Sequence, residues 1–131
     1  MSNKSELVKI FESAAREAGK LIKKEFGKVT ESKVQSKDLG DFVTNTDLET
    51  ENILLNILKK NFPKSSYLTE ESDPFKGNDE TIVIDPIDGT SNFIHGIPSI
   101  GIVIARVHKE EITDGIIFNP VSDELFFATK D

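Results

Sequence analysis

The spacing of apolar residues changes at Pro63, and this change limits the fold of the 131-residue chain more than any other feature. Before it, apolar residues recur at steps of three and four, which is typical of amphipathic helices. After it come runs rich in Ile, Val and Phe, separated by turn residues, which predict strands. This order predicts an α+β domain in which two helices pack on a largely antiparallel sheet.

The first helix is predicted from Glu6 to Phe26, where the apolar residues fall on one face. Gly27 is placed to end it. Gly19 lies inside the helix, where glycine costs roughly 1 kcal/mol relative to alanine. Close packing of this part of the helix against another backbone would explain the glycine.

A short strand near Val34 and a turn at residues 38–41 are expected between the helices. The second helix is predicted to begin at Thr46, because Thr46 and Glu49 fit a capping box. It is expected to end at residues 61–63, where a proline follows.

Five strands are expected after Pro63, with turns supplied by residues 109–110 and 119–120. Their expected ranges are Tyr67–Thr69, Thr81–Ile84, Ser99–Val107, Glu111–Phe118 and Glu124–Ala128.

The composition indicates an acidic globular chain with a formal net charge of -7 and a pI of about 4.9. No basic face is evident, which argues against nucleic-acid binding. The absence of cysteine excludes disulfides and thiolate metal ligands. No apolar signal region or run of ~18 apolar residues is present. We therefore expect a soluble cytoplasmic protein that binds neither nucleic acid nor membrane.

The strongest candidate site follows the predicted strand that ends at Ile84. Asp85 and Asp88 flank a proline-fixed turn and can converge on one point, with the Ile87 carbonyl nearby. Hard cations such as Mg²⁺ prefer these oxygen ligands. Residues 89–91 look like the start of a helix, whose free N–H groups suit an anion. The alternative is an acidic turn with an ordinary helix cap.

Two further candidates are weaker by themselves. Glu70 and Glu71 follow a short strand, and because adjacent side chains point apart, one of the two is expected to enter a site. The alternative is a solvated acidic loop. Residues 44–47 offer Asp47, although a helix start with a capping threonine explains this segment equally well.

Together these segments resemble the inositol monophosphatase family in order and spacing. The four elements are residues 41–47, 69–72, 84–93 and 95–98, and the longest of them, Ile84-Asp85-Pro86-Ile87-Asp88-Gly89-Thr90-Ser91-Asn92-Phe93, is the family's signature. The resemblance implies the N-terminal half of a layered αβαβα sugar-phosphatase fold. Residues 1–131 would then form its metal- and phosphate-binding domain, and the C-terminal domain would be absent from this chain.

The resemblance also assigns metal ligands. Glu70 is similar to the glutamate that binds the activating magnesium and helps to position the attacking water. Asp85 is similar to the aspartate that bridges two metals. Ile87 would lend its carbonyl, and Asp88 would bind the second metal.

Three further residues match positions that bind water and phosphate in the family. Thr90 resembles the threonine that contacts the nucleophilic water, and Asp47 resembles the carboxylate that holds this threonine. The amides of Gly89 and Thr90 would bind phosphate. The implied reaction is in-line attack of a metal-activated water on a phosphate monoester.

Departures from the family pattern affect the second half and one loop. An aspartate in a Trp-Asp-x-Ala-Ala-Gly element completes the second metal site in the family, and this chain has no such element. Lys33 and Lys37 both approximate the family's loop lysine, and neither is assigned. His95 belongs to a structural turn in the family. His108 is expected at the surface without a carboxylate partner.

The resemblance implies a lithium-sensitive-type phosphatase acting on inositol monophosphate or a similar polyol phosphate. Branches of the family that act on fructose bisphosphate, histidinol phosphate or 3'-phosphoadenosine nucleotides are alternatives. A further alternative is a truncated, non-catalytic metal-binding or scaffold fragment.

Self-association is expected as well, because strands that meet other elements in the full family fold would be left uncovered. The prediction is a homo-oligomer with the late strands at its interface. The apolar residues expected at this uncovered surface are Ile100, Ile102, Ile104, Ile116, Phe118, Phe126 and Phe127.

Overall fold

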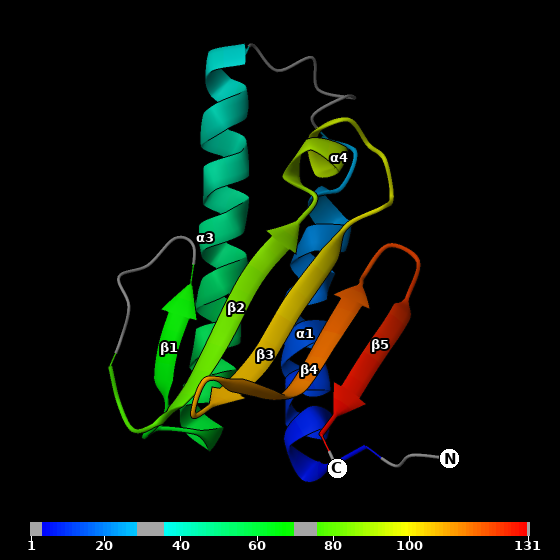
Figure 1. Cartoon of the computed structure of the whole chain (residues 1–131). Helices are drawn as coiled ribbons and strands as arrows, with labels where there is room; N and C mark the ends of the chain where they lie inside the picture. Colours follow the sequence, from blue (N-terminus) through cyan, green and yellow to red (C-terminus); the bar gives the residue numbers. More distant parts are fainter. Residues whose placement is uncertain (1–3, 29–35, 70–75, 131) are drawn as a thin grey trace.

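The computed structural model describes residues 4–28, 36–69 and 76–130, with the backbone alone over residues 36–44. Within these described residues, three helices and five strands follow one another (Figure 1). The helices are α1 (Glu6–Glu25), α3 (Ser36–Asn61) and α4 (Thr90–Ile94). The strands are β1 (Ser66–Thr69), β2 (Glu80–Asp88), β3 (Gly101–His108), β4 (Glu111–Asn119) and β5 (Glu124–Thr129).

The strands form one sheet in the order β1-β2-β3-β4-β5. Only β1 and β2 pair in parallel, and the other three pairings are antiparallel. Both long helices lie on the same face of the sheet, with α1 behind β3–β5 and α3 behind β2 (Figure 1). The predicted α+β architecture, two helices on a largely antiparallel sheet, is confirmed.

The core lies between the helices and this face of the sheet. Alternate strand residues such as Ile82, Ile84, Ile102 and Ile104 point into it and are almost fully buried. Phe11 of α1 packs among them with no exposed surface. Burying each such side chain contributes roughly 1.5–3 kcal/mol, so these side chains hold the helical layer on the sheet.

The expectation that seven apolar residues of the late strands lie uncovered is wrong for most of them. Ile100, Ile102, Ile104, Ile116 and Phe118 are all buried. Phe127 is partly buried against the core, and only Phe126 is exposed. The reason is the two-residue period of strands, which directs these residues and their neighbours to opposite faces. The uncovered face carries the neighbours instead.

Helix α1 has the predicted limits. The Ser5 hydroxyl accepts a hydrogen bond from the Val8 amide at 3.1 Å and caps its start. Gly27, at φ +83°, follows its last turn, in a conformation that favours glycine. A Cβ on Gly19 would lie 2.9 Å from both Phe118 Cε2 and Pro120 Cβ. The glycine therefore permits close approach of α1 to the end of β4, although it contacts side chains there and not another backbone as expected.

Helix α3 begins at Ser36, so the prediction of a start at Thr46 with a capping box is wrong. The turn expected at residues 38–41 lies within the same helix, and Val34 lies outside the described residues. A capping side chain is needed only where the first N–H groups of a helix have no carbonyl to bind. Because the helix continues before Thr46, carbonyl groups of the preceding turn accept these hydrogen bonds instead. The Thr46 carbonyl itself accepts a hydrogen bond from the Thr50 hydroxyl at 2.7 Å.

All five expected strands are present, with ends that differ by a few residues. The largest difference is in β2, which continues to Asp88 rather than stopping at Ile84. Across the described parts of the chain, no helix combines the length and apolarity that crossing a membrane requires.

A substitution at Gly19 tests the close approach of α1 to the sheet. Gly19→Ala removes a helix penalty of roughly 1 kcal/mol, but it forces atoms of the buried Phe118 and of Pro120 apart. Overpacking typically costs about 1–3 kcal/mol, so we expect a net loss of about 1 kcal/mol in the free energy of unfolding. Urea denaturation measures it.

Ser13→Ala is the matched control, since Ser13 lies on the exposed face of the same helix. It should leave stability unchanged or raise it by a few tenths of a kcal/mol. A Gly19→Ala variant as stable as Ser13→Ala would contradict the packing argument.

Candidate active site

The two aspartates of the signature lie on one face of the sheet because β2 contains a bulge. Asp85 is paired with Val103 and Asp88 with Gly101, so β2 advances three residues while β3 advances two. One extra residue returns Asp88 to the face on which Asp85 lies. The acids thus occupy the last residues of a strand, rather than a turn after it as expected.

The bulge is built from Pro86 and Ile87, both of which are buried. Proline has no N–H to donate to the sheet, and it is tolerated at a bulge because the regular ladder is interrupted there. The Ile87 side chain is 3% exposed and anchors this segment in the core. Asp85 remains half-buried and Asp88 exposed, so the second acid is open to ligands in solution.

Gly89 turns the chain from β2 into α4. Its φ is +89°, and a Cβ at this position would lie 2.9 Å from the Ser99 carbonyl oxygen, so only glycine fits. The expected helix start is confirmed, since the Phe93 amide donates to the Gly89 carbonyl at 3.0 Å. The amides of residues 90–92 precede this bond and have no partner within the helix.

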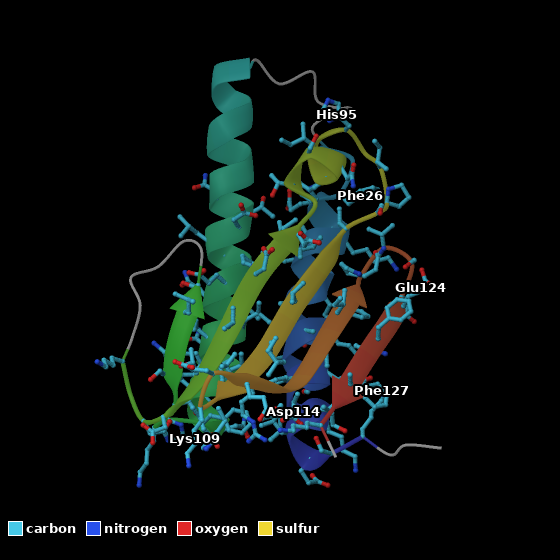
Figure 2. The ribbon with its side chains drawn as sticks, in the orientation of Figure 1. Phe26, His95, Lys109, Asp114, Glu124 and Phe127 are labelled. Carbon is cyan, nitrogen blue, oxygen red and sulfur yellow. The ribbon has the colours of Figure 1, made fainter. Side chains whose placement is uncertain are left out.

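Contacts on both sides hold α4 in place. The Asn92 side chain donates to the Ser99 carbonyl at 2.7 Å, and Phe93 is buried beside Phe26, with 6.2 Å between ring centroids. His95 Nδ1 lies 2.7 Å from the Ser91 carbonyl, in agreement with a structural role. Figure 2 shows His95 and Phe26 at the same end of the molecule, beyond the end of β2.

The Thr90 hydroxyl donates to the Ile87 carbonyl at 3.3 Å. This distance exceeds the usual 2.5–3.0 Å of O–H···O bonds, so the bond is weak. Two predicted site residues, Thr90 and Ile87, are therefore in contact through the turn that Asp88 and Gly89 form between them. The predicted contact between Thr90 and Asp47 stays a prediction.

Helix α3 directs a polar stripe toward the interior, next to the strand that carries the aspartates. Thr46, Asp47, Thr50 and Glu51 are each less than 9% exposed, and α3 packs against β2. Buried acids are costly unless other groups compensate them, and neither Asp47 nor Glu51 is without a partner. Glu51 escaped the sequence analysis, although its spacing of four from Asp47 places both on one helix face.

The donor set suits a hard cation in its chemistry. Carboxylates and a carbonyl oxygen are the ligands of Mg²⁺, and the chain has no cysteine to favour softer metals. Within the described residues, no three acid or histidine side chains group together as a metal site. Glu70 and Glu71 lie outside the described residues, so the convergence of Glu70 with Asp85 and Asp88 stays a prediction. Of the two unassigned loop lysines, Lys33 lies outside the described residues and only the backbone of Lys37 is described.

His108 departs from its prediction. Its Nδ1 lies 3.6 Å from the Glu80 carboxylate, so it has the carboxylate partner that was not expected. The pairing of Glu80 with His108 across β2 and β3 brings them together. Arg106 also contacts Glu80, and it pairs with the buried Asp114 at 2.8 Å. This cluster lies at the opposite end of β2 from the aspartates.

Residues 3–131 match the inositol monophosphatase family, and the chain belongs to this family. It is 40% identical over 120 residues to the inositol-1-monophosphatase of Caulobacter vibrioides, covering 89% of this chain and 47% of that protein. It is 37% identical over 119 residues to Nus factor SuhB of Escherichia coli K12, and this match covers 89% of this chain and 45% of that protein.

The crystal structure of the extragenic suppressor protein suhB from Bartonella henselae has the same fold, with a TM-score of 0.82 and 35% identity. The match covers 95% of this chain and 48% of that one. The chain therefore spans about half the length of the relatives that it matches. The resemblance to the first half of the family fold is confirmed.

Substitution of Gly89 tests the geometry of the site. Gly89→Ala forces a side chain into the left-handed region, at roughly 1–2 kcal/mol, and against the Ser99 carbonyl. We expect a loss of at least ~2 kcal/mol in the free energy of unfolding, measured by urea denaturation.

Gly27→Ala is the control, because Gly27 has a similar φ but nothing within 4 Å of its added Cβ. In this variant the free energy of unfolding should fall only by the cost of placing a side chain in the left-handed region. Equal losses in the two variants would show that the contact with Ser99 contributes nothing.

Proposed function

We propose that this chain supplies the metal- and phosphate-binding part of a magnesium-dependent phosphomonoesterase that acts on inositol monophosphate or a related polyol phosphate. The observation that carries the proposal is the β2 bulge, which sets Asp85 and Asp88 on one face directly before Gly89 and the first turn of α4. Membership of the inositol monophosphatase family and the 40% identity to an inositol-1-monophosphatase support it.

Charge explains why such a site needs a cation. The chain carries a formal net charge of -7, and a phosphate monoester is itself an anion. Carboxylates beside a bound phosphate would repel it unless a cation lies between them. Asp85, Asp88 and the Ile87 carbonyl, together with Glu70, would hold Mg²⁺, with Asp85 shared between two ions. Bound magnesium would activate a water molecule and stabilise the leaving oxygen.

The phosphate would lie against the first turn of α4. The Gly89 and Thr90 amides would donate to its oxygens, and the positive end of the short helix adds to the attraction. Since the hydrogen bond from Thr90 to Ile87 is long, its hydroxyl can turn to an attacking water at little cost. Asp47, on the buried face of α3, would hold this hydroxyl in the orienting position.

The half-length match supports a second function for the chain by itself. Without the aspartate that the other half of the family fold supplies, it would bind metal and phosphate and turn over slowly. Measuring Mg²⁺ binding separately from phosphate release from inositol 1-phosphate distinguishes the two. Binding with slow release favours a binding fragment, whereas release that EDTA abolishes favours the enzyme.

Asp85→Asn tests the metal assignment. It removes charge while keeping shape, and we expect Mg²⁺ affinity to fall at least ~10-fold in isothermal titration calorimetry, with magnesium-dependent phosphate release abolished. Asp79→Asn is the control, because Asp79 is an exposed acid just before the other end of β2. Unchanged Mg²⁺ binding in Asp85→Asn, or equal losses in both variants, would contradict the assignment.

Thr90→Ala tests the role of the hydroxyl. We expect phosphate release to slow by about 10²-fold while Mg²⁺ affinity stays within twofold, since the hydroxyl orients water rather than binding the ion. Ser91→Ala, one residue further along α4, is the control and should keep its rate. A Thr90→Ala variant with a normal rate and weakened Mg²⁺ binding would reverse the assignment.

A further inference from the structure

Helix α4 follows the signature aspartates directly, and it is too short to keep its shape alone. It has five residues, and a single helical turn is not stable in water without contacts to the rest of the fold. Its backbone hydrogen bonds run from the Phe93 amide to the Gly89 carbonyl at 3.0 Å and from the His95 amide to the Ser91 carbonyl at 3.1 Å. The direction of its first turn therefore depends on side-chain contacts with neighbouring segments.

Asn92 supplies such a contact beside Gly89. Its side-chain amide donates to the Ser99 carbonyl at 2.7 Å. A Cβ on Gly89 would lie 2.9 Å from this carbonyl oxygen and 3.5 Å from Asn92 Nδ2. Asp88, on the other side of Gly89, pairs with Gly101 in the sheet. The turn between β2 and α4 is thus bound at two points, one before Gly89 and one after it, to the segment that leads into β3.

The residue to which Asn92 binds is itself fixed. The carbonyl of Pro98, one residue before Ser99, accepts a hydrogen bond from the side chain of Asn119 at 2.8 Å. Ile100, one residue after Ser99, is 6% exposed. A hydrogen bond to Ser99 therefore ties α4 to a segment that both the end of β4 and the core hold in place.

We propose that Asn92 is a positioning residue for the candidate site, an inference that rests on the proposed function. Its hydrogen bond to Ser99 fixes the turn at Gly89. Before this turn lies Asp88, a proposed metal ligand, and after it lies Thr90, whose hydroxyl is proposed to orient water. Groups that act together in a site must be held within about 0.5 Å of the productive geometry. A turn free to rotate at Gly89 would weaken both roles.

Asn92→Ala is the test. It removes the amide donor, and because alanine favours helix more than asparagine does, any loosening of α4 comes from the lost hydrogen bond. Phe93, which is 1% exposed, still attaches α4 to the core, so the variant should fold, as circular dichroism checks. By NMR, hydrogen exchange at the Phe93 and His95 amides should be at least ~5-fold faster. In isothermal titration calorimetry, Mg²⁺ affinity should fall about 10-fold.

Asn61→Ala is the matched control, because the Asn61 side chain also donates to a backbone carbonyl, that of Ile57, at 2.9 Å. Asn61 is the last residue of α3, at the end of the molecule away from α4 (Figure 1). This substitution should change neither exchange in α4 nor Mg²⁺ affinity. Asn92→Gln keeps the amide donor on a longer side chain, so it should bind Mg²⁺ more tightly than Asn92→Ala.

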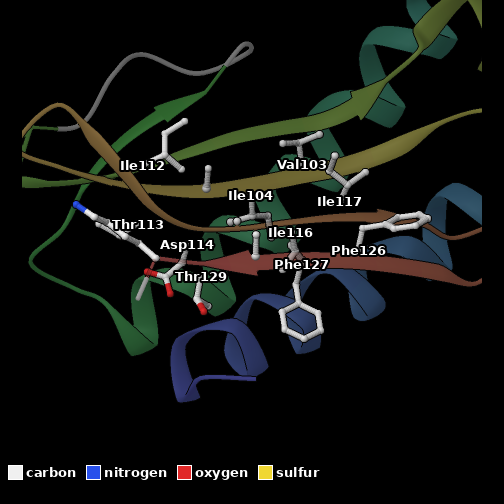
Figure 3. A pocket seen from close by; sticks show the side chains of 14 residues that line it. Val103, Ile104, Ile112, Thr113, Asp114, Ile116, Ile117, Phe126, Phe127 and Thr129 are labelled. Atoms are coloured by element: carbon white, nitrogen blue, oxygen red, sulfur yellow. The ribbon is translucent and has the colours of Figure 1, made fainter. Parts of the chain in front are cut away.

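The apolar groove of the sheet does not affect this comparison. The groove, of about 510 Å³, runs over β3, β4 and β5, and Val103, Ile117 and Phe126 are among the residues that line it (Figure 3). Neither Asn92 nor Asn61 lines it. Substitution of either asparagine therefore leaves the groove, and whatever binds there, unchanged.

Two results would overturn the inference and leave the proposed function intact. If the amides of α4 exchange no faster in Asn92→Ala than in the unsubstituted chain, the hydrogen bond to Ser99 does not order the turn. If they exchange faster while Mg²⁺ affinity stays unchanged, Asn92 has a structural role only. An unsubstituted chain that binds no Mg²⁺ would instead overturn the proposed function, and the inference would fall with it.

Discussion

One-sided burial of the sheet determines the rest of the structure. The side chains of Phe11, Ile82 and Ile104 pack together between the helices and one face of the strands. This leaves alternate residues, including Val103 and Ile117, on the other face. The β2 bulge then adds one residue, so that Asp85 and Asp88 both escape the core and point to that other face. A regular strand would have placed residues three apart on opposite faces.

The strands and α1 could be predicted from the sequence because each rests on a local signal. The β-branched run before Asp85 predicts β2, and the apolar stripe that ends at Gly27 predicts α1. The start of α3 could not be predicted in this way, because Thr46 and Glu49 satisfy a capping pattern whether or not a helical segment precedes them. A capping box indicates a start only where the backbone before it leaves the helix.

Non-local pairing explains the other errors. Glu80 and His108 are distant in sequence, and only the register of β2 against β3 joins them. The buried state of Ile116 and the exposure of Ile117 likewise depend on which face α1 covers. The local backbone from Asp85 to Thr90 is easier to predict, because these residues are consecutive and the proline and glycine among them restrict the backbone. Their convergence with Glu70 involves a separate segment, and it remains a prediction.

The candidate site lies on the sheet face that is turned away from α1 and α3, and this has a chemical consequence. Carboxylates exposed to water attract a cation weakly, because water screens their charge. A polypeptide seated over Val103 and Ile117 would remove water from the row of residues that ends at Asp85. The attraction between Asp85 and a cation would then grow, while the cost of keeping two acids ionised without a cation would grow as well. Covering this face of the sheet and the proposed binding of a metal would therefore be coupled, and each would favour the other.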